Sequence, residues 1–591
     1  MTGQAWGPKA MSYNQKTGET STTPRPSNHD PETMTDRAMR APRWLVWGSI
    51  GLITIGCLLR FSGLGQFLPW YDELATLQHI AVQSELDLTQ LWQGREQVLA
   101  DLWHSLSTKP QKTTWDMVIS LATHDAHHPP LYYLFVRVWA DWFGNTIVSL
   151  RTATAIMGVI LLASVFWLLR QLSQRPSLPW VGTVLVALSP LQILYAQEAR
   201  EYAIWLIFFV LSSGFLARSL RHSSWPHWLL YGLTLTLNWY SHLLGGFVLL
   251  GHGLWVGVWV WRSSDRNWRR AIPWAIAAVG TLLAISPWIW VLYRAQTQSI
   301  ASLAWLNQAG PPGIHRWAAL RAFAATLWDN QPNLWASFPT ATDIPYLMVT
   351  LWMIVALVGC WRSGEPLLKG FVLSAVAPFL VLVWLPAIVM DRTMASIIRY
   401  QLPLLLGMQV VLANWIVTTC EQITPKPVQE WPQPLSFYLF RWRWMPHCFA
   451  ALLAILLLVA NLNAARARSW QLSWWSKGGT VPVEIAKALK EVDRPLLVMT
   501  DIPGYSLSAL ALSHASDRLK SRGVTVWLAP SFQGLNWPDR PNTFLFSPSP
   551  DLRQAIEQRG QRLIPFGTSW WNLWRLQSST PDRPAPDRPS N

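Results

Sequence analysis

The chain has 591 residues and a formal net charge of +15, yet only 13% of its residues are charged and 51% are hydrophobic. Ordinary globular proteins contain about 25% charged residues, so the composition excludes a soluble fold for most of the chain. Its basic residues are spread over short connectors between apolar stretches, which is typical of cytoplasmic loops and not of a nucleic-acid-binding surface.

The N-terminal part predicts a cytoplasmic start to the chain. Residues 1–43 are polar and rich in Pro, Ser and Thr, which predicts a disordered tail. The first apolar stretch, at about 44–60, follows a basic segment, so we expect the N-terminus in the cytoplasm. The next segment, 62–146, is acidic and too polar to span a bilayer. We therefore predict that it forms an extracytoplasmic loop with interfacial helices.

Further apolar stretches of membrane-spanning length recur up to about residue 461, with basic connectors at alternate ends. They predict a polytopic α-helical membrane domain at 44–475 with about eleven transmembrane helices. An odd number of spans places the C-terminus outside the cytoplasm.

The C-terminal part of the chain changes in character. Residues 476–577 alternate short strand-like and helix-like segments, which predicts a small α/β domain on the extracytoplasmic side. Residues 578–591 are rich in Pro and predict a second disordered tail. The four cysteines lie within or beside the spans and indicate neither a disulfide framework nor a thiolate metal site.

Unusual polar residues gather where the spans open into the extracytoplasmic side. Asp72 and Glu73 are adjacent acids that can supply a general base or a metal ligand. Such a pair is often only solvated surface, but its amphipathic surroundings favour a site at the interface. His127 and His128 offer imidazoles for acid–base chemistry, metal ligation or binding of a charged group. Their spacing differs from that of a helical zinc site.

Charged residues at the level of the bilayer are expensive unless they are paired or functional. Glu198 and Arg200 lie in such a place, where they can form an ion pair between helices. Alternatively, Arg200 and Arg399 can form a clamp for phosphate oxygens. Phosphate loops and the common hydrolase motifs are missing from the sequence. This pattern indicates a lipid-linked substrate that bears phosphate.

The ordered motifs YDELA, HHPPLYYLFVRVW, SPLQILYAQEAREYA, NWYSHLLGGFVLL and IIRYQLPLLL resemble those of the GT-C membrane glycosyltransferases. The resemblance covers about 44–417 and is to the bacterial branch related to protein O-mannosyltransferases and the lipid A aminoarabinose transferase. It implies transfer of a sugar from a polyprenyl-phosphate donor to an acceptor hydroxyl, lipid or glycan, with inversion. It also implies a multi-pass protein of the bacterial plasma membrane that acts on the periplasmic face.

The resemblance implies roles for individual residues. The family's catalytic carboxylate in the first loop matches Asp72, and Glu73 completes the pair. We expect the leaving phosphate to be stabilised by Arg200 and Arg399, helped by His128. The full set of expected substrate-binding residues is His127, His128, Tyr132, Gln197, Glu198, Arg200, His242, Arg399 and Tyr400.

Other interpretations stay open at this point. A transporter or flippase of polyprenyl-linked glycans would show polar residues in mid-span and paired broken helices. The membrane part could also serve as an anchor for the C-terminal domain, or the protein could resemble an O-antigen ligase. No cofactor is required by the sequence, but a divalent metal ion on Asp72 or Glu73 is compatible with it. The expected partners are the sugar donor, a lipid or glycan acceptor and the bilayer, with no nucleic acid.

Overall fold

The computed structural model describes residues 41–107, 111–297, 314–324, 326–327, 343–390, 393–423, 457, 459, 480–500, 505–521, 523–529, 540–567 and 572–577. Most of the expected N-terminal tail, the eleventh span near residue 461 and the C-terminal tail at 578–591 lie outside these residues.

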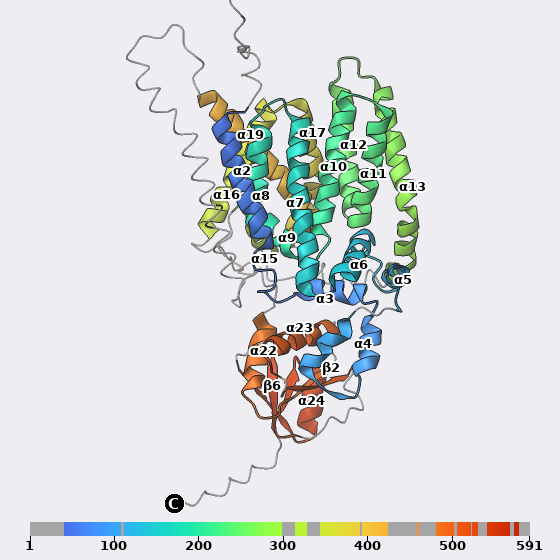
Figure 1. Ribbon diagram of the computed structural model, residues 1–591, viewed down its shortest axis with the longest axis vertical. Helices are drawn as coiled ribbons and strands as arrows, with labels where there is room; N and C mark the ends of the chain where they lie inside the picture. Colours follow the sequence, from blue (N-terminus) through green and yellow to red (C-terminus); the bar gives the residue numbers. More distant parts are fainter. Residues whose placement is uncertain are drawn as a thin grey trace, which may run out of the picture. The chain divides into compact units, whose positions relative to one another are not determined.

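The described part of the chain contains seven helical segments that are long and apolar enough to cross a membrane (Figure 1). They are α2 (Arg43–Phe61), α7 (Ile147–Leu172), α10 (Tyr202–Arg221), η2 (Trp268–Ala271) with α13 (Ile272–Arg294), α16 (Ile344–Ser363), α17 (Pro366–Phe379) with η5 (Leu380–Trp384) and α18 (Leu385–Met390), and η7 (Ile398–Gln401) with α19 (Leu402–Ile423). The bent pair α8 (Leu178–Ala187) and α9 (Pro190–Gln197) makes up to eight.

Two further helices, α11 (Trp225–Ser241) and α12 (Gly245–Arg262), lie where the fifth and sixth spans are expected. They are 17 and 18 residues long and are not among the segments that are long and apolar enough to span. The predicted fold class, a polytopic helical membrane protein, is confirmed. The number of spans is seven or eight by length and apolarity within the described residues, compared with the eleven expected.

The bend between α8 and α9 brings charged residues into the protein interior. Pro190 begins α9, and since proline cannot donate a backbone hydrogen bond it interrupts the helix there. The two helices are bent by 60°. At the end of α9, the Gln197 amide donates to the carbonyl oxygens of Leu59 (2.7 Å) and Ser62 (2.8 Å), beside the end of α2. The segment 198–201 is therefore held in a buried position.

The first loop folds into short elements at one end of the helices (Figure 1). These are α3 (Tyr71–Ile80), α4 (Glu85–Trp92), β1 (Glu96–Val98), η1 (Leu99–Leu106), α5 (Thr114–His124) and α6 (Leu131–Phe143). Arg137 on α6 donates to the carbonyl oxygens of Ile80 and Lys112 and pairs with Asp141. The Arg137 side chain thus connects α6 to the C-terminal end of α3. The acidic pair lies in the first turn of the same helix.

Among the described residues, the C-terminal part contains three helices and contributes five strands to a six-stranded sheet. Its elements are α22 (Thr480–Lys490), β2 (Leu496–Thr500), α23 (Tyr505–Arg518), β3 (Thr525–Ala529), β4 (Thr543–Phe546), α24 (Pro550–Gln558), β5 (Arg562–Pro565) and β6 (Leu573–Gln577). The strand order is β1-β3-β2-β4-β6-β5. Strand β2 is parallel to β3 and β4, while the other pairings are antiparallel.

One strand of this sheet comes from the first loop and not from the expected C-terminal segment 476–577. Strand β1 pairs with the edge of β3, with Gln97 opposite Val526. Without β1, β3 would present an unpaired edge, which proteins avoid or cover. The first loop and the C-terminal segment thus build the sheet together.

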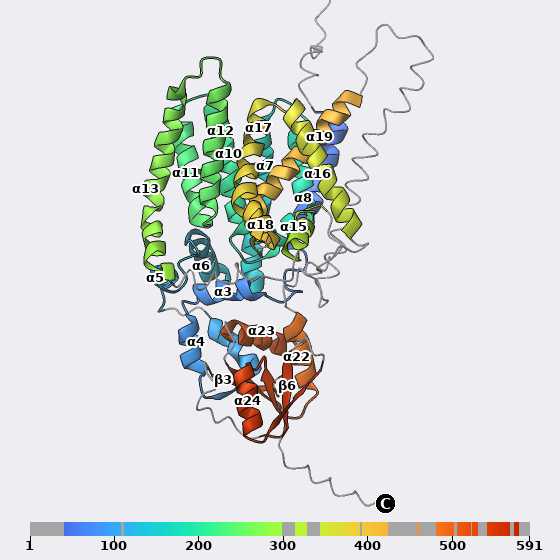
Figure 2. The same cartoon turned by 180° about the vertical axis from the view of Figure 1, so that it is seen from behind.

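Helix α23 packs against the first loop and reaches the helix that carries Asp72 (Figure 2). The Tyr71 hydroxyl lies 2.6 Å from Ser508 Oγ. The backbone N–H of Trp103 donates to Ser513 Oγ at 2.8 Å. Arg518 donates to the carbonyl oxygen of Gln66 at 3.0 Å. The start of α3 is therefore fixed from outside the membrane helices.

His514, in the contact between α23 and the first loop, predicts that the folded protein is less stable in acid. The His514 ring packs on Trp103 at 4.3 Å between centroids, and burial, helped by nearby Arg518, lowers the pKa of His514 to about 3. In the unfolded chain a histidine takes up its proton near pH 6.5. Between these values the unfolded state binds more protons, so stability falls as pH falls from about 6.5. We expect a lower melting temperature at pH 5 than at pH 7.

Thermal unfolding of the purified full chain at the two pH values measures this effect. His514→Phe should reduce the difference between them, because the substituted ring cannot take up a proton. The matched control is His104→Phe, a change of an exposed histidine in η1. Equal pH dependence in His514→Phe and the unsubstituted protein would contradict the prediction.

Candidate active site

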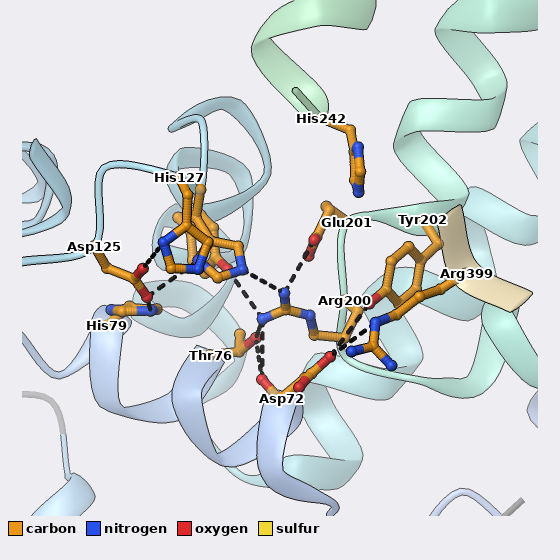
Figure 3. Close-up of polar contacts among 12 residues, drawn as sticks. Asp72, Thr76, His79, Asp125, His127, Arg200, Glu201, Tyr202, His242 and Arg399 are labelled. Atoms are coloured by element: carbon orange, nitrogen blue, oxygen red, sulfur yellow. Dashed lines mark hydrogen bonds and ion pairs between the residues drawn. The ribbon is translucent and has the colours of Figure 1, made fainter. Parts of the chain in front are cut away.

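A cavity of about 240 Å³ lies beside the start of α3 (Figure 3). Its wall combines residues from the first loop, the segment after α9, the turn after α11 and the segment before α19. The lining residues are Asp72, His127, His128, Pro129, Arg200, Glu201, Tyr202, His242, Leu243, Leu244, Met394, Arg399 and Tyr400.

Asp72 presents its carboxylate to this cavity from the first turn of α3. Its Oδ2 accepts a hydrogen bond from the Tyr202 hydroxyl at 3.3 Å and lies 3.6 Å from Nε of Arg399. The Arg399 guanidinium in turn lies 5.2 Å from the ring centroid of Trp70. The Asp72 side chain is 24% exposed, so it can meet a substrate and remains close to a positive charge.

Glu73 points away from the cavity and is fully buried. Its carboxylate forms a bidentate ion pair with Arg151, at 2.8 Å to Nε and 2.6 Å to Nη2. The backbone N–H of Ala199 donates to the same carboxylate at 2.9 Å. Arg151 also donates to the carbonyl oxygens of Leu64 and Phe67. The predicted catalytic residue Glu73 is thus held in the interior by Arg151 and Ala199, and unlike Asp72 it does not line the cavity.

Arg200 supplies a fixed positive charge in the wall of the cavity. It donates to the carbonyl oxygen of Asp72 (3.0 Å), the Tyr133 hydroxyl (3.0 Å), Nε2 of His128 (2.9 Å) and Oε1 of Glu201 (3.0 Å). Burial disfavours its charge, but Glu201 and the neighbouring tyrosines outweigh burial and raise the pKa of Arg200 well above its usual value. The guanidinium is immobilised by groups of four residues.

Three imidazoles surround the carboxylate of Asp125. Its oxygens lie 2.9 Å from His79 Nε2, 2.7 Å from His127 Nδ1 and 3.0 Å from His128 Nδ1. Burial opposes ionisation of Asp125, but the surrounding imidazoles, His128 foremost, outweigh burial and hold the pKa of the carboxyl well below its usual range. Asp125 is thus an anion that orients these rings.

The contact between Arg200 and His128 fixes the position of a proton. A guanidinium can only donate, so Nε2 of His128 must accept and the ring proton must lie on Nδ1. Nδ1 faces Asp125. Burial lowers the pKa of His128, which agrees with a neutral ring. Asp125 therefore holds His128 in the orientation that receives Arg200.

The group His79, Asp125 and His128 could also hold a metal ion, because its ligand atoms lie within 4.8 Å of one another. Two imidazoles and a carboxylate suit Zn²⁺. The expected metal ligands, Asp72 and Glu73, do not form such a group among the described residues. A metal on Nδ1 of His128 would displace the proton of that ring, and Nε2 would then no longer accept from Arg200.

We therefore expect the protein to work without a bound metal. Treatment with EDTA should leave its activity unchanged, and elemental analysis of the purified protein should find well below one zinc per chain. One zinc per chain that is lost in His79→Ala would show instead that the Arg200 contact is replaced by metal ligation.

The remaining residues predicted from the sequence divide into two groups. His242 and Tyr400 line the cavity. Tyr132, Gln197 and Glu198 are buried but do not line it. Tyr132 packs edge-on against Tyr133 with ring centroids 5.3 Å apart. The cavity thus brings together side chains from positions 72 to 400. Tyr132, Gln197 and Glu198 lie in the protein interior outside the cavity lining.

Several residues of the site were not among the sequence predictions. Glu201 and Tyr202 line the cavity and belong to the same YAQEAREY segment as Arg200. His79 follows Asp72 by seven residues, which places both side chains on one face of α3. That helical spacing was a signal in the sequence. No local signal in the sequence indicated that Glu201, and not Glu198, lines the cavity.

The helices and the cavity define a multi-pass membrane protein with an enzyme-like polar site near one end of its helices. The family model of the dolichyl-phosphate-mannose-protein mannosyltransferases matches residues 127–290. The matched segment includes His128, Arg200 and His242. This match confirms the resemblance to protein O-mannosyltransferases that the motifs predicted, and it points to a membrane glycosyltransferase.

Two solved structures are among those similar to this chain. ArnT from Cupriavidus metallidurans bound to undecaprenyl phosphate is 11% identical, with 93% of this chain and 100% of that chain covered and a TM-score of 0.48. The apo oligosaccharyltransferase of Archaeoglobus fulgidus is 11% identical, with 83% and 65% covered and a TM-score of 0.43. No curated protein matches the sequence.

Proposed function

We propose that the protein transfers a sugar from a polyprenyl-phosphate donor to an acceptor hydroxyl at the extracytoplasmic face of a bacterial plasma membrane. The observation that carries this proposal is the cavity in which the Asp72 carboxylate lies beside Arg399, with Arg200 in the same wall. A carboxylate can accept a proton while arginines stabilise a phosphate. The family matched over 127–290 is described by a polyprenyl-phosphate sugar, dolichyl-phosphate-mannose.

The reaction is a single displacement at the anomeric carbon. Asp72 takes the proton of the acceptor hydroxyl as its oxygen attacks the anomeric carbon. The bond from that carbon to the phosphate oxygen breaks, and its electrons leave with the polyprenyl phosphate. Arg399 and Arg200 lie where they can stabilise the charge that develops on the phosphate. Attack from the face opposite the leaving group inverts the anomeric configuration.

The distribution of basic residues supports an extracytoplasmic cavity. Helix α10 begins at Tyr202 in the cavity wall and carries Arg218 and Arg221 in its last turn. Basic residues gather on the cytoplasmic side of membrane proteins. The end of α10 that carries them is about 30 Å from Tyr202, because a helix rises 1.5 Å per residue. The cavity would then face the other side.

The test is transfer by the purified full chain in proteoliposomes. Undecaprenyl-phosphate mannose and undecaprenyl-phosphate glucose are supplied as donors with a lipid extract of bacterial envelopes as acceptor. Release of undecaprenyl phosphate, together with a product heavier by one hexose in mass spectrometry, supports the proposal. Movement of an intact donor across the bilayer without release would favour a flippase. A flippase is expected to contain paired broken helices, and among the described residues α8 and α9 form the only bent pair.

A further inference from the structure

Glu201 is a buried carboxylate in the cavity wall whose hydrogen bonding is incomplete. Its side chain is 5% exposed, and Oε1 accepts from Arg200 at 3.0 Å. Oε2 is shielded from solvent and has no hydrogen-bond partner among the residues that the structure describes. A buried charged oxygen without a partner is costly. A ligand in the cavity could supply the missing donor after a small rotation of the carboxylate.

His242 offers a hydrogen-bond donor to the same cavity. Its ring is stacked on Trp205 with centroids 4.2 Å apart, and the backbone N–H of Leu244 donates to Nδ1 at 3.2 Å. Since Nδ1 accepts, the proton of the neutral ring lies on Nε2. Burial lowers the pKa of His242 to about 4, so the ring is neutral near pH 7. The Leu244 contact and the Trp205 stack hold the ring in place.

Glu201 and His242 line the same cavity. In Figure 3 the Glu201 carboxylate points toward Arg200, the His242 ring lies on the opposite side of Glu201, and Arg200 lies between Glu201 and Asp72. A hydroxyl group both donates and accepts hydrogen bonds, so it matches a carboxylate oxygen together with an imidazole N–H. We propose that Glu201 and His242 form a subsite that binds a hydroxyl group of the transferred sugar. This inference rests on the proposed function and adds a residue pair that recognises the sugar part of the donor.

The charges of the site favour a neutral sugar hydroxyl over other groups. A phosphate would be repelled by the Glu201 carboxylate, whereas Arg399 offers it a positive partner elsewhere in the cavity. An ammonium group is not needed, because Arg200 already balances the charge of Glu201. The acceptor hydroxyl must reach Asp72, which lies on the other side of Arg200. Since these groups do not fit the subsite, we assign it to the sugar of the donor.

The experiment compares binding of a lipid with and without its sugar. Dissociation constants are measured for undecaprenyl phosphate and undecaprenyl-phosphate mannose with the full chain in nanodiscs. The variants are Glu201→Gln, which removes the charge, and His242→Phe, which keeps a ring over Trp205 but removes the N–H. The loss of a hydrogen bond that contributes about 1.4 kcal/mol corresponds to a tenfold change in affinity. We therefore expect each variant to bind the mannosyl lipid about tenfold more weakly.

Undecaprenyl phosphate should bind both variants as tightly as the unsubstituted protein, which also shows that the cavity is intact. The matched control is Glu421→Gln. Glu421 lies in the last turn of α19, is half-exposed and pairs with Arg175. Equal loss of affinity for both lipids would overturn the subsite, and so would unchanged affinity combined with slower turnover. Failure of the unsubstituted protein to bind either lipid would instead overturn the proposed function.

Discussion

Asp72→Asn is expected to abolish sugar transfer, with a rate loss of about 10²–10⁴-fold, the usual contribution of a general base. The amide has nearly the same shape and can still accept from Tyr202, but it cannot take the proton of the acceptor hydroxyl. The Asp72 carbonyl that binds Arg200 is part of the backbone and is retained. The measurement is the initial rate of undecaprenyl phosphate release in proteoliposomes, at donor concentrations that saturate the protein.

The control for this variant is Asp141→Asn, which changes a partly exposed carboxylate of α6 in the same loop. It should transfer sugar at close to the normal rate. Asp72→Asn should also melt near the normal temperature, since the Asp72 side chain is partly exposed and its contact with Arg399 is long. A rate within a few-fold of normal in Asp72→Asn would remove Asp72 from the mechanism.

Arg151→Gln is expected to lower the free energy of unfolding by about 3–5 kcal/mol, the usual cost of removing one partner of a buried ion pair. Arg151 and Glu73 are both fully buried, and the substitution leaves the Glu73 carboxylate without its bidentate partner. The carbonyl groups of Leu64 and Phe67 lose their donor as well. Thermal unfolding of the purified protein, and its yield in membranes, measure the loss.

The double variant Glu73→Gln with Arg151→Gln tests the reason for this loss. Two amides can hydrogen-bond without leaving an unpaired charge in the interior, so the double variant should be more stable than Arg151→Gln alone. If the double variant is no more stable than Arg151→Gln alone, the unpaired charge of Glu73 is not the source of the stability loss. Since Glu73 does not line the cavity, any loss of transfer in these variants should follow the loss of folded protein.

The sequence alone was sufficient for the class of protein and for the neighbourhood of the site. A stretch of about 20 apolar residues inserts into a bilayer because of its composition, so the spans could be predicted without knowledge of their packing. Positive residues between the spans then placed Asp72, His128, Arg200, His242 and Arg399 on one side. The structure brings these five residues to one cavity.

Only the tertiary structure decided which member of the acidic pair reaches the cavity. Neighbouring residues on a helix point about 100° apart, so Asp72 and Glu73 meet different surroundings, and only packing shows which one meets Arg151 and which one Arg399. The placement of β1 against β3 is likewise a contact between residues more than 400 positions apart. Such contacts depend on how the whole chain packs, and no local pattern in the sequence encodes them.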